Sequence, residues 1–353
     1  MKQSALSLVV AAVALLFASG IAVRVVADAD WDVTVLAAFG EDDHSTRTYA
    51  EERLGEVFLR SDLGHDGRFF FVQSNDPWVT DPAENIDVVD RPLYRSQRML
   101  YPVLAGGGGL LNAEAIIWSM IIVNVIAMGL GSWAVAQVAI EMGGSPWWGL
   151  AFVLNIGFIS EMTIGAAGVV AGAAAFGSVA LWMKDRTGWA VTLMTLAVLS
   201  REAMLVAALG TSWYLWKRGE RRQAILATAV PATAAAMWAL YIRLRIGGGA
   251  GVDQVEEIGL PFVGFAKAYG SWLGNPVDLA VALAMMLLFL LFVRRVLLSG
   301  ELVGWAFVGF VALAILFTEQ VWISYFNITR AIAPVITAFV LLVFASSDAE
   351  EHR

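Results

Sequence analysis

Ten apolar runs separated by short polar stretches make up most of the chain. They cover residues 5–27, 114–139, 147–160, 162–183, 188–200, 203–216, 223–244, 277–293, 302–318 and 331–346. A helix of about 20 apolar residues crosses the roughly 30 Å hydrocarbon core of a bilayer. The pattern therefore predicts an all-α polytopic membrane protein with about ten membrane helices, organised as a single domain over residues 1–353.

The stretch 187–216 carries basic residues beyond both ends and a charged pair, Arg201–Glu202, in its middle. Because basic residues gather in cytoplasmic loops, we expect this stretch to enter the membrane and return. Each half has about 13–16 residues, or about 20–24 Å at 1.5 Å per residue, which is too short to cross the core. The run 147–160, which ends at Glu161, is also short. The alternative, one long tilted helix over 187–216, would invert the topology of everything downstream.

The same topology places the polar segments 28–98, 245–276 and 319–330 outside the cell. The first is expected to be an extracytoplasmic loop with short interfacial helices, and the second another large extracytoplasmic loop with a glycine-rich start at 246–259. Both termini are then cytoplasmic in a multi-pass protein of the inner, or plasma, membrane. Residues 1–27 resemble a signal peptide, but their apolar run is long enough to remain as an uncleaved first span.

Composition supports a membrane protein and excludes several other classes. Hydrophobic residues make up 59% of the chain and charged residues 15%, against roughly 45–50% and 25% in ordinary soluble domains. The net charge of −8 argues against a nucleic-acid partner. The absence of cysteine excludes disulfides and thiolate chemistry, and the three histidines are too scattered to form a metal cluster.

The stretch "DLGHDGRFFF" at 62–71 offers two candidate general bases, Asp62 and Asp66. A carboxylate held near a substrate hydroxyl can accept its proton, and glycines on either side allow tight turns. We expect Phe69–Phe71 to lie on the membrane interface or against the outer ends of helices, which would hold Asp66 at the mouth of a cavity. The alternative is a solvated turn with aromatic anchors.

The stretch "RPLYRSQRMLYP" at 91–102 predicts an amphipathic helix lying in the membrane interface. Arg95 and Arg98 are three residues apart, so they share one face of a helix. Guanidinium groups bind phosphate through paired hydrogen bonds, so these arginines are candidate ligands for a lipid phosphate. General headgroup anchoring is the alternative.

Four charged residues near the outer ends of apolar runs are further candidates for substrate binding. Ionisable groups within the membrane are costly and commonly functional, which singles out Glu161, Arg201 and Glu202. Arg330 stands at the outer start of the last run. A structural ion pair that satisfies itself, and simple anchoring in the case of Arg330, are the alternatives.

Four segments together resemble the GT-C superfamily of integral-membrane glycosyltransferases, in particular poorly characterised bacterial members: "HDGRFFF", "YRSQRMLYP", "SREAML" and "ITRAIAP". The resemblance implies that a sugar moves from a polyprenyl-phosphate carrier to a glycan, lipid or protein acceptor on the extracytoplasmic face. It further implies Asp66 as the base and Arg201 and Arg330, with Arg98, as ligands of the carrier phosphate. No cofactor is expected to be required, and a divalent metal is allowed but not indicated.

A transporter with an intramembrane Glu/Arg site is the alternative function. Transporters often contain internal repeats with broken helices in both halves, and the sequence shows no such repeat. A phosphate-binding P-loop, an H-E-x-x-H zinc motif and a G-x-S-x-G nucleophile motif do not occur in the sequence.

Overall fold

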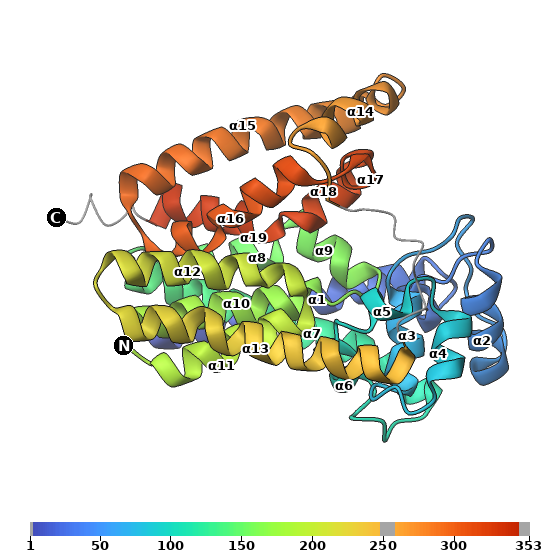
Figure 1. Ribbon diagram of the computed structural model, residues 1–353. Helices are drawn as coiled ribbons and strands as arrows, with labels where there is room; N and C mark the ends of the chain where they lie inside the picture. Colours follow the sequence, from blue (N-terminus) through green and yellow to red (C-terminus); the bar gives the residue numbers. More distant parts are fainter. Residues whose placement is uncertain (1–2, 248–257, 346–353) are drawn as a thin grey trace.

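The computed structural model describes residues 3–247 and 258–345, and these residues form an all-helical protein (Figure 1). Four helices are long and apolar enough to cross a membrane: α1 (Gln3–Ala27), α7 (Ala113–Glu141), α13 (Arg221–Ile246) and α15 (Pro276–Ser299). A fifth candidate is the bent pair Tyr325–Ala331 and Ala333–Ala345, whose halves meet at 66°. The predicted helical class is confirmed, and the apolar helices indicate insertion into a lipid bilayer.

The remaining helices around this framework are shorter. They comprise α8 (Leu150–Val153), α9 (Ile156–Thr163), α10 (Gly168–Met183), α11 (Thr187–Ser200), α12 (Leu205–Lys217), α14 (Val263–Trp272), α16 (Leu302–Leu316), α17 (Glu319–Trp322), α18 (Tyr325–Ala331) and α19 (Ala333–Val340), with the 3₁₀ helices η2 (Pro146–Gly149) and η3 (Glu202–Met204) and the π-helical turn η4 (Leu341–Ala345).

The stretch 187–216 folds as two helices with a break at Arg201, as predicted. Arg201 is extended, with φ −153° and ψ 115°, so it ends α11 and precedes η3 and α12. The hydroxyl of Ser178 on α10 donates to the carbonyl of Ala190 on α11 at 2.7 Å, and that of Thr228 on α13 donates to the carbonyl of Ala208 on α12 at 3.1 Å. The turns from α12 to α13 and from α15 to α16 lie at the end of the molecule that holds the N-terminus (Figure 1). We call the three consecutive elements α11, η3 and α12 the α11–α12 hairpin.

The run 147–160 was predicted as one short helix, and this prediction is wrong. The structure divides it into η2, α8 and α9, with an extended residue, Asn155, between α8 and α9. The Asn155 side chain accepts from the backbone N–H of Gly157 at 2.9 Å and donates to the carbonyl of Ala333 at 2.7 Å. This cap begins a new helix, α9, which carries Glu161 in its last turns. The bond from Asn155 to Ala333 ties α9 to α19.

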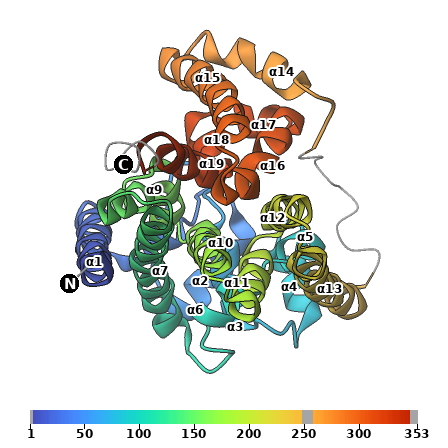
Figure 2. The same ribbon diagram turned by 90° about the vertical axis from the view of Figure 1, so that its left-hand side faces the viewer.

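The helical core is built around α7, which lies between α1 and α10 (Figure 2). Helix α1 turns a row of small residues, Ala14, Ala18 and Ala22, toward the interior, and all three are buried. Small side chains at four-residue spacing let helix backbones approach closely, which favours packing in an apolar environment. This close packing fixes α7 and α10, the scaffold on which the charged residues are placed.

Residues 28–112 form a separate polar cap at the end opposite the N-terminus (Figure 1). Its short helices are η1 (Val33–Ala37), α2 (His44–Leu54), α3 (Gly67–Asn75), α4 (Pro82–Val88), α5 (Pro92–Arg95) and α6 (Leu100–Ala105). Short helices occur within 28–98 as predicted, while their interfacial, extracytoplasmic position stays a prediction. The cap has its own apolar core, which packs against the first turns of α7.

Phe69, Phe70 and Phe71 lie in that core beside the first turns of α7, so the predicted packing against helix ends is confirmed and the predicted membrane interface is wrong. They are 2%, 3% and 0% exposed. Their rings contact aromatic neighbours: Phe71 meets Phe39 edge-on at 5.5 Å between centroids, and Phe70 meets Tyr101 at 5.1 Å. Because elements surround α3 on all sides, three consecutive aromatic residues are buried together, and they fix the helix that follows Asp66.

The segment 91–102 is likewise not one helix. Helix α5 ends at Arg95, α6 begins at Leu100, and Arg98 lies in the turn between them. The segment 245–276 contains the end of α13 and all of α14, while the glycine-rich stretch predicted at 246–259 lies largely outside the described residues. The splitting of 91–102 matters for the site because Arg98 lies outside both helices, where its guanidinium contacts Tyr94 of α5 and Glu202.

Candidate anion-binding site

A cavity of about 260 Å³ opens where the polar cap meets the α11–α12 hairpin and α18. We call it the arginine pocket. Six arginines line it: Arg68, Arg91, Arg95, Arg98, Arg201 and Arg330. Asp66 is the one carboxylate among the described lining residues, and His65, Tyr94, Phe69, Gln320 and Asn327 complete the polar and aromatic wall. Its volume lies slightly below the range of small-molecule sites, which begins at about 300 Å³.

Asp66 is held by two arginines from opposite sides. Its Oδ1 lies 2.5 Å from Nη1 of Arg95, and its Oδ2 lies 2.7 Å from Nη2 of Arg330. Burial alone would raise the pKa of Asp66, but the charges of Arg95 and Arg330 outweigh it and hold that pKa well below its usual range. Asp66 is therefore an ionised carboxylate whose two oxygens both accept from guanidinium groups.

The turn that presents Asp66 requires its glycines. Gly64 has φ +73°, which L-residues with side chains rarely adopt. A Cβ at Gly67 would lie 2.1 Å from the carbonyl oxygen of Ile164, so only glycine lets α3 begin this close to the end of α9. The predicted tight turn is confirmed at Gly64, whereas Gly67 is required for the close approach of two chain segments.

Asp62, the second candidate base, stays outside the arginine pocket. Its side chain is exposed, and its Oδ1 accepts from the backbone N–H of Gly64 at 2.7 Å. The structure therefore gives Asp62 a role in shaping the turn and does not bring it to the six arginines.

Glu161 sits behind the pocket and connects two of its arginines. Its side chain is buried, and its Oε1 lies 3.2 Å from Nη1 of Arg201 and 3.3 Å from Nε of Arg330. Its Oε2 accepts at 3.1 Å from the backbone N–H of Gly168, the first residue of α10. A helix N-terminus favours a negative charge, so α10 helps to fix the carboxylate that positions both guanidinium groups.

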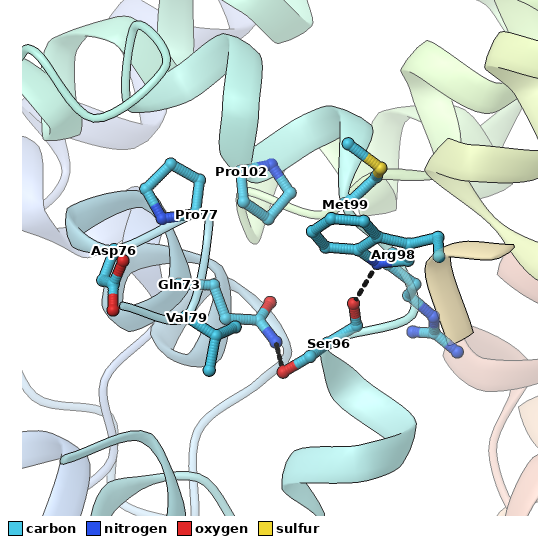
Figure 3. A pocket seen from close by; sticks show the side chains of 9 residues that line it. Gln73, Asp76, Pro77, Val79, Ser96, Arg98, Met99 and Pro102 are labelled. Carbon is cyan, nitrogen blue, oxygen red and sulfur yellow. Dashed lines mark hydrogen bonds between the residues drawn. The ribbon is translucent and has the colours of Figure 1, made fainter. Parts of the chain in front are cut away.

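Arg98 and Glu202 join the polar cap to the α11–α12 hairpin. Nε and Nη2 of Arg98 donate to the two oxygens of Glu202 at 3.1 and 3.0 Å, a paired geometry, and Nη2 also donates to the hydroxyl of Tyr94. Figure 3 shows the Arg98 guanidinium pointing away from a small void lined by Gln73 and Ser96. That void, about 10 Å³, has room for about one water.

Three further residues of the pocket were missed by the sequence analysis: Arg68, Arg91 and His65. Arg68 reaches Asp43, with 2.6 Å between Nε and Oδ2, and its guanidinium lies over the ring of Phe69 at 4.4 Å. Arg68 and His65 flank the "DG" pair within the quoted motif, so their proximity to Asp66 was a signal that could have found them.

Arginines and carboxylates alternate around the pocket. Within residues 3–247 and 258–345, five carboxylates pair with the six arginines: Asp43, Asp66, Asp90, Glu161 and Glu202. Guanidinium groups at such density bind phosphate or carboxylate through charge-assisted hydrogen bonds, so the arrangement suits an anion.

Comparisons with known proteins give no match, so a functional assignment rests on the geometry of the site. No family model, no curated protein and no solved structure matches the chain. Residues 3–247 and 258–345 contain no group of three or more His, Asp or Glu side chains suited to a metal ion.

Proposed function

We propose that this protein is a membrane glycosyltransferase of the GT-C type, which moves a sugar from a polyprenyl-phosphate carrier to a glycan, lipid or protein acceptor. The arginine pocket is the observation that carries the proposal. A sugar-linked polyprenyl phosphate is an anionic phosphodiester, whose phosphate oxygens can accept hydrogen bonds from the guanidinium groups that line the pocket. Its lipid tail suits a pocket bordered by apolar helices.

In this proposal the arginines stabilise the leaving group. As the bond between the sugar and the phosphate breaks, negative charge grows on the phosphate oxygen. Preformed hydrogen-bond donors at that position lower the barrier because they need no rearrangement during the reaction. Arg201 and Arg330, both fixed by Glu161, are suited to hold the phosphate, and Arg98 and Arg95 extend the donor surface from the polar cap. The chemistry requires no nucleotide or bound cofactor.

The proposal also places the protein in the membrane. About ten helical segments, some of them short, would lie within the bilayer of the inner, or plasma, membrane, with both termini in the cytoplasm. Basic residues flank the turn between α10 and α11, where Lys184 lies, and the turn between α12 and α13, where Arg221 lies. Arg294 is one of the basic residues within the last turns of α15. Since basic loops favour the cytoplasm, the polar cap and the arginine pocket would face the extracytoplasmic side.

Donor turnover tests the proposal directly. The purified protein in lipid nanodiscs is mixed with polyprenyl phosphates carrying mannose, glucose, galactose or arabinose, together with a membrane lipid and oligosaccharide extract. We expect release of polyprenyl phosphate with at least one donor. Arg330→Gln should reduce kcat/KM by at least 100-fold, while Arg218→Gln, which removes an exposed arginine at the other end of the molecule, should leave it unchanged.

Two outcomes would contradict the proposal. One is a wild-type protein that turns over none of the donors. The other is an Arg330→Gln variant that matches the wild type. Uptake of a solute into vesicles without donor turnover would favour the transporter.

A further inference from the structure

We propose that His65, and not Asp66, takes the proton from the acceptor hydroxyl in this reaction. The inference rests on the proposed glycosyl transfer and revises the role predicted for Asp66. His65 and Asp66 are consecutive residues that line the same pocket, and their surroundings differ in ways that give them different chemistry.

Asp66 is poorly suited to accept a proton. Its two oxygens each meet a guanidinium group, Arg95 at 2.5 Å and Arg330 at 2.7 Å. Protonation would cost both ion pairs, so the carboxylate is a weak base as long as it is clamped. Catalysis by a general base is most efficient when its pKa lies near the working pH. The geometry instead suits Asp66 to positioning Arg95 and Arg330 around the phosphate.

His65 has the opposite setting. Its ring lies beside Phe326, with 5.0 Å between centroids, and its backbone N–H donates to the carbonyl of Ala38 at 3.0 Å. Within the described part of the chain, its imidazole nitrogens make no hydrogen bond with a protein group. A half-buried imidazole on the pocket wall with free nitrogens is available to a ligand.

The charged groups around His65 keep it neutral and therefore able to accept. They are Arg330 from α18, Arg60 and Asp62 from the preceding loop, and Asp66 beside it. Burial lowers the pKa of His65, and the charges of Arg330 and Arg60 lower it further, against a smaller opposing effect of Asp62 and Asp66. An uncharged imidazole at neutral pH is the form of histidine that acts as a base.

The acceptor hydroxyl oxygen forms a bond to the anomeric carbon of the sugar, and the bond from that carbon to the phosphate oxygen breaks. The electron pair of that bond leaves with the polyprenyl phosphate, which the arginines hold. The hydroxyl proton moves to an imidazole nitrogen of His65, giving an imidazolium that later releases the proton to water.

The pH dependence of turnover separates the two residues. With the donor found active above, wild-type kcat/KM should fall on the acid side with an apparent pKa below the usual histidine value of about 6.5. His65→Asn should lower kcat at least 100-fold and abolish the acid limb, that is, the fall of kcat/KM at low pH. Asp66→Asn should mainly raise KM for the donor and keep this acid limb. His44→Asn, at an exposed histidine, is the matched control and should resemble the wild type.

A second measurement keeps the inference testable if His65→Asn folds poorly. The chain has three histidines, so ¹³C labelling at the imidazole Cε1 position gives three NMR signals, and His65→Gln identifies the one from His65. Farnesyl phosphate in the arginine pocket should raise the pKa of His65, because a nearby anion favours the imidazolium, and should leave that of His44 unchanged.

The outcomes are distinct from those of the proposed function. Turnover by His65→Asn within tenfold of the wild type, or an acid limb that persists in it and disappears in Asp66→Asn, would overturn the role of His65 while leaving glycosyl transfer intact. A His65 signal that does not respond to farnesyl phosphate would also overturn it. A wild-type protein inactive on every donor would overturn the proposed function itself.

Discussion

Nη2 of Arg330 lies 2.7 Å from Oδ2 of Asp66, although 264 residues separate them in the chain. One comes from the turn before α3 and the other from α18, just before the 66° bend. Nε of the same guanidinium lies 3.3 Å from Oε1 of Glu161. This contact joins the polar cap to the helical body at the wall of the arginine pocket.

Removing the charge of Asp66 should destabilise the protein, whereas the same change at Asp62 should not. Asp66→Asn leaves Arg95 and Arg330 close together without their shared carboxylate. Losing one partner of a buried ion pair costs about 3–5 kcal/mol, and we expect the lower end because Asp66 keeps some exposure. Asp62→Asn should change stability by less than about 0.5 kcal/mol, as an exposed position does. Thermal denaturation in one detergent measures both, and equal shifts would contradict the clamp.

The stability difference between wild type and Asp66→Asn should depend on pH in one direction. The pKa of folded Asp66 is held well below its usual range, chiefly by Arg95 and Arg330 acting against burial. Its contribution is therefore fully present above the unfolded pKa of about 3.9 and is lost as pH falls through the lower folded value. The gap in thermal midpoint should be constant from pH 7 to 5 and narrow below pH 4. A gap that narrows already between pH 7 and 5 would contradict this.

Two glycine-to-alanine changes should have opposite effects. A Cβ at Gly168 would lie 2.6 Å from Cδ of Glu161, so Gly168→Ala should displace the carboxylate that fixes Arg201 and Arg330. A Cβ at Gly188 meets nothing within 4 Å, and alanine is favoured over glycine in a helix by up to about 1 kcal/mol. Gly168→Ala should lower the thermal midpoint and weaken binding of polyprenyl phosphate, while Gly188→Ala should leave binding unchanged and raise the midpoint. Unaltered binding in Gly168→Ala would show that Glu161 does not position the arginines.

Arg98 and Glu202 should be energetically coupled. They form a paired ion bridge whose side chains are 12% and 31% exposed, whereas Arg47 and Glu51 on α2 form a bridge whose side chains are 37% and 38% exposed. A double-mutant cycle with Arg98→Gln and Glu202→Gln should give a coupling energy of about 1–3 kcal/mol. The same cycle on Arg47 and Glu51 should give about 0.3–0.5 kcal/mol. Similar values for the two pairs would mean that the bridge does not hold the cap to the hairpin.

The break at Arg201 could be predicted because it depends on local features. Basic residues flank the stretch 187–216 on both sides, and a charged pair interrupts its apolar run. Asp66, Arg95, Arg98, Arg201 and Arg330 were likewise singled out by their chemistry, and the structure brings all five to one pocket.

The errors concern contacts between distant segments. The burial of Phe69–Phe71 depends on α2, α6 and α7 closing around α3, which no local pattern reveals. The division of 147–160 depends on Asn155 bonding to Ala333, 178 residues away. His65 directly precedes Asp66, but its place beside Phe326 on the pocket wall depends on a segment far along the chain.

If α11 lies in the bilayer as proposed, its shortness has a consequence for the surrounding lipid. Its 14 residues extend about 21 Å at 1.5 Å per residue, while a hydrocarbon core is about 30 Å thick. A hydrophobic surface that short is matched by local thinning of the bilayer. Lipid headgroups beside α11 would then sit deeper than elsewhere, at the level of the Arg201 guanidinium. A phosphate could therefore reach the protein sideways from its own leaflet, without leaving the membrane.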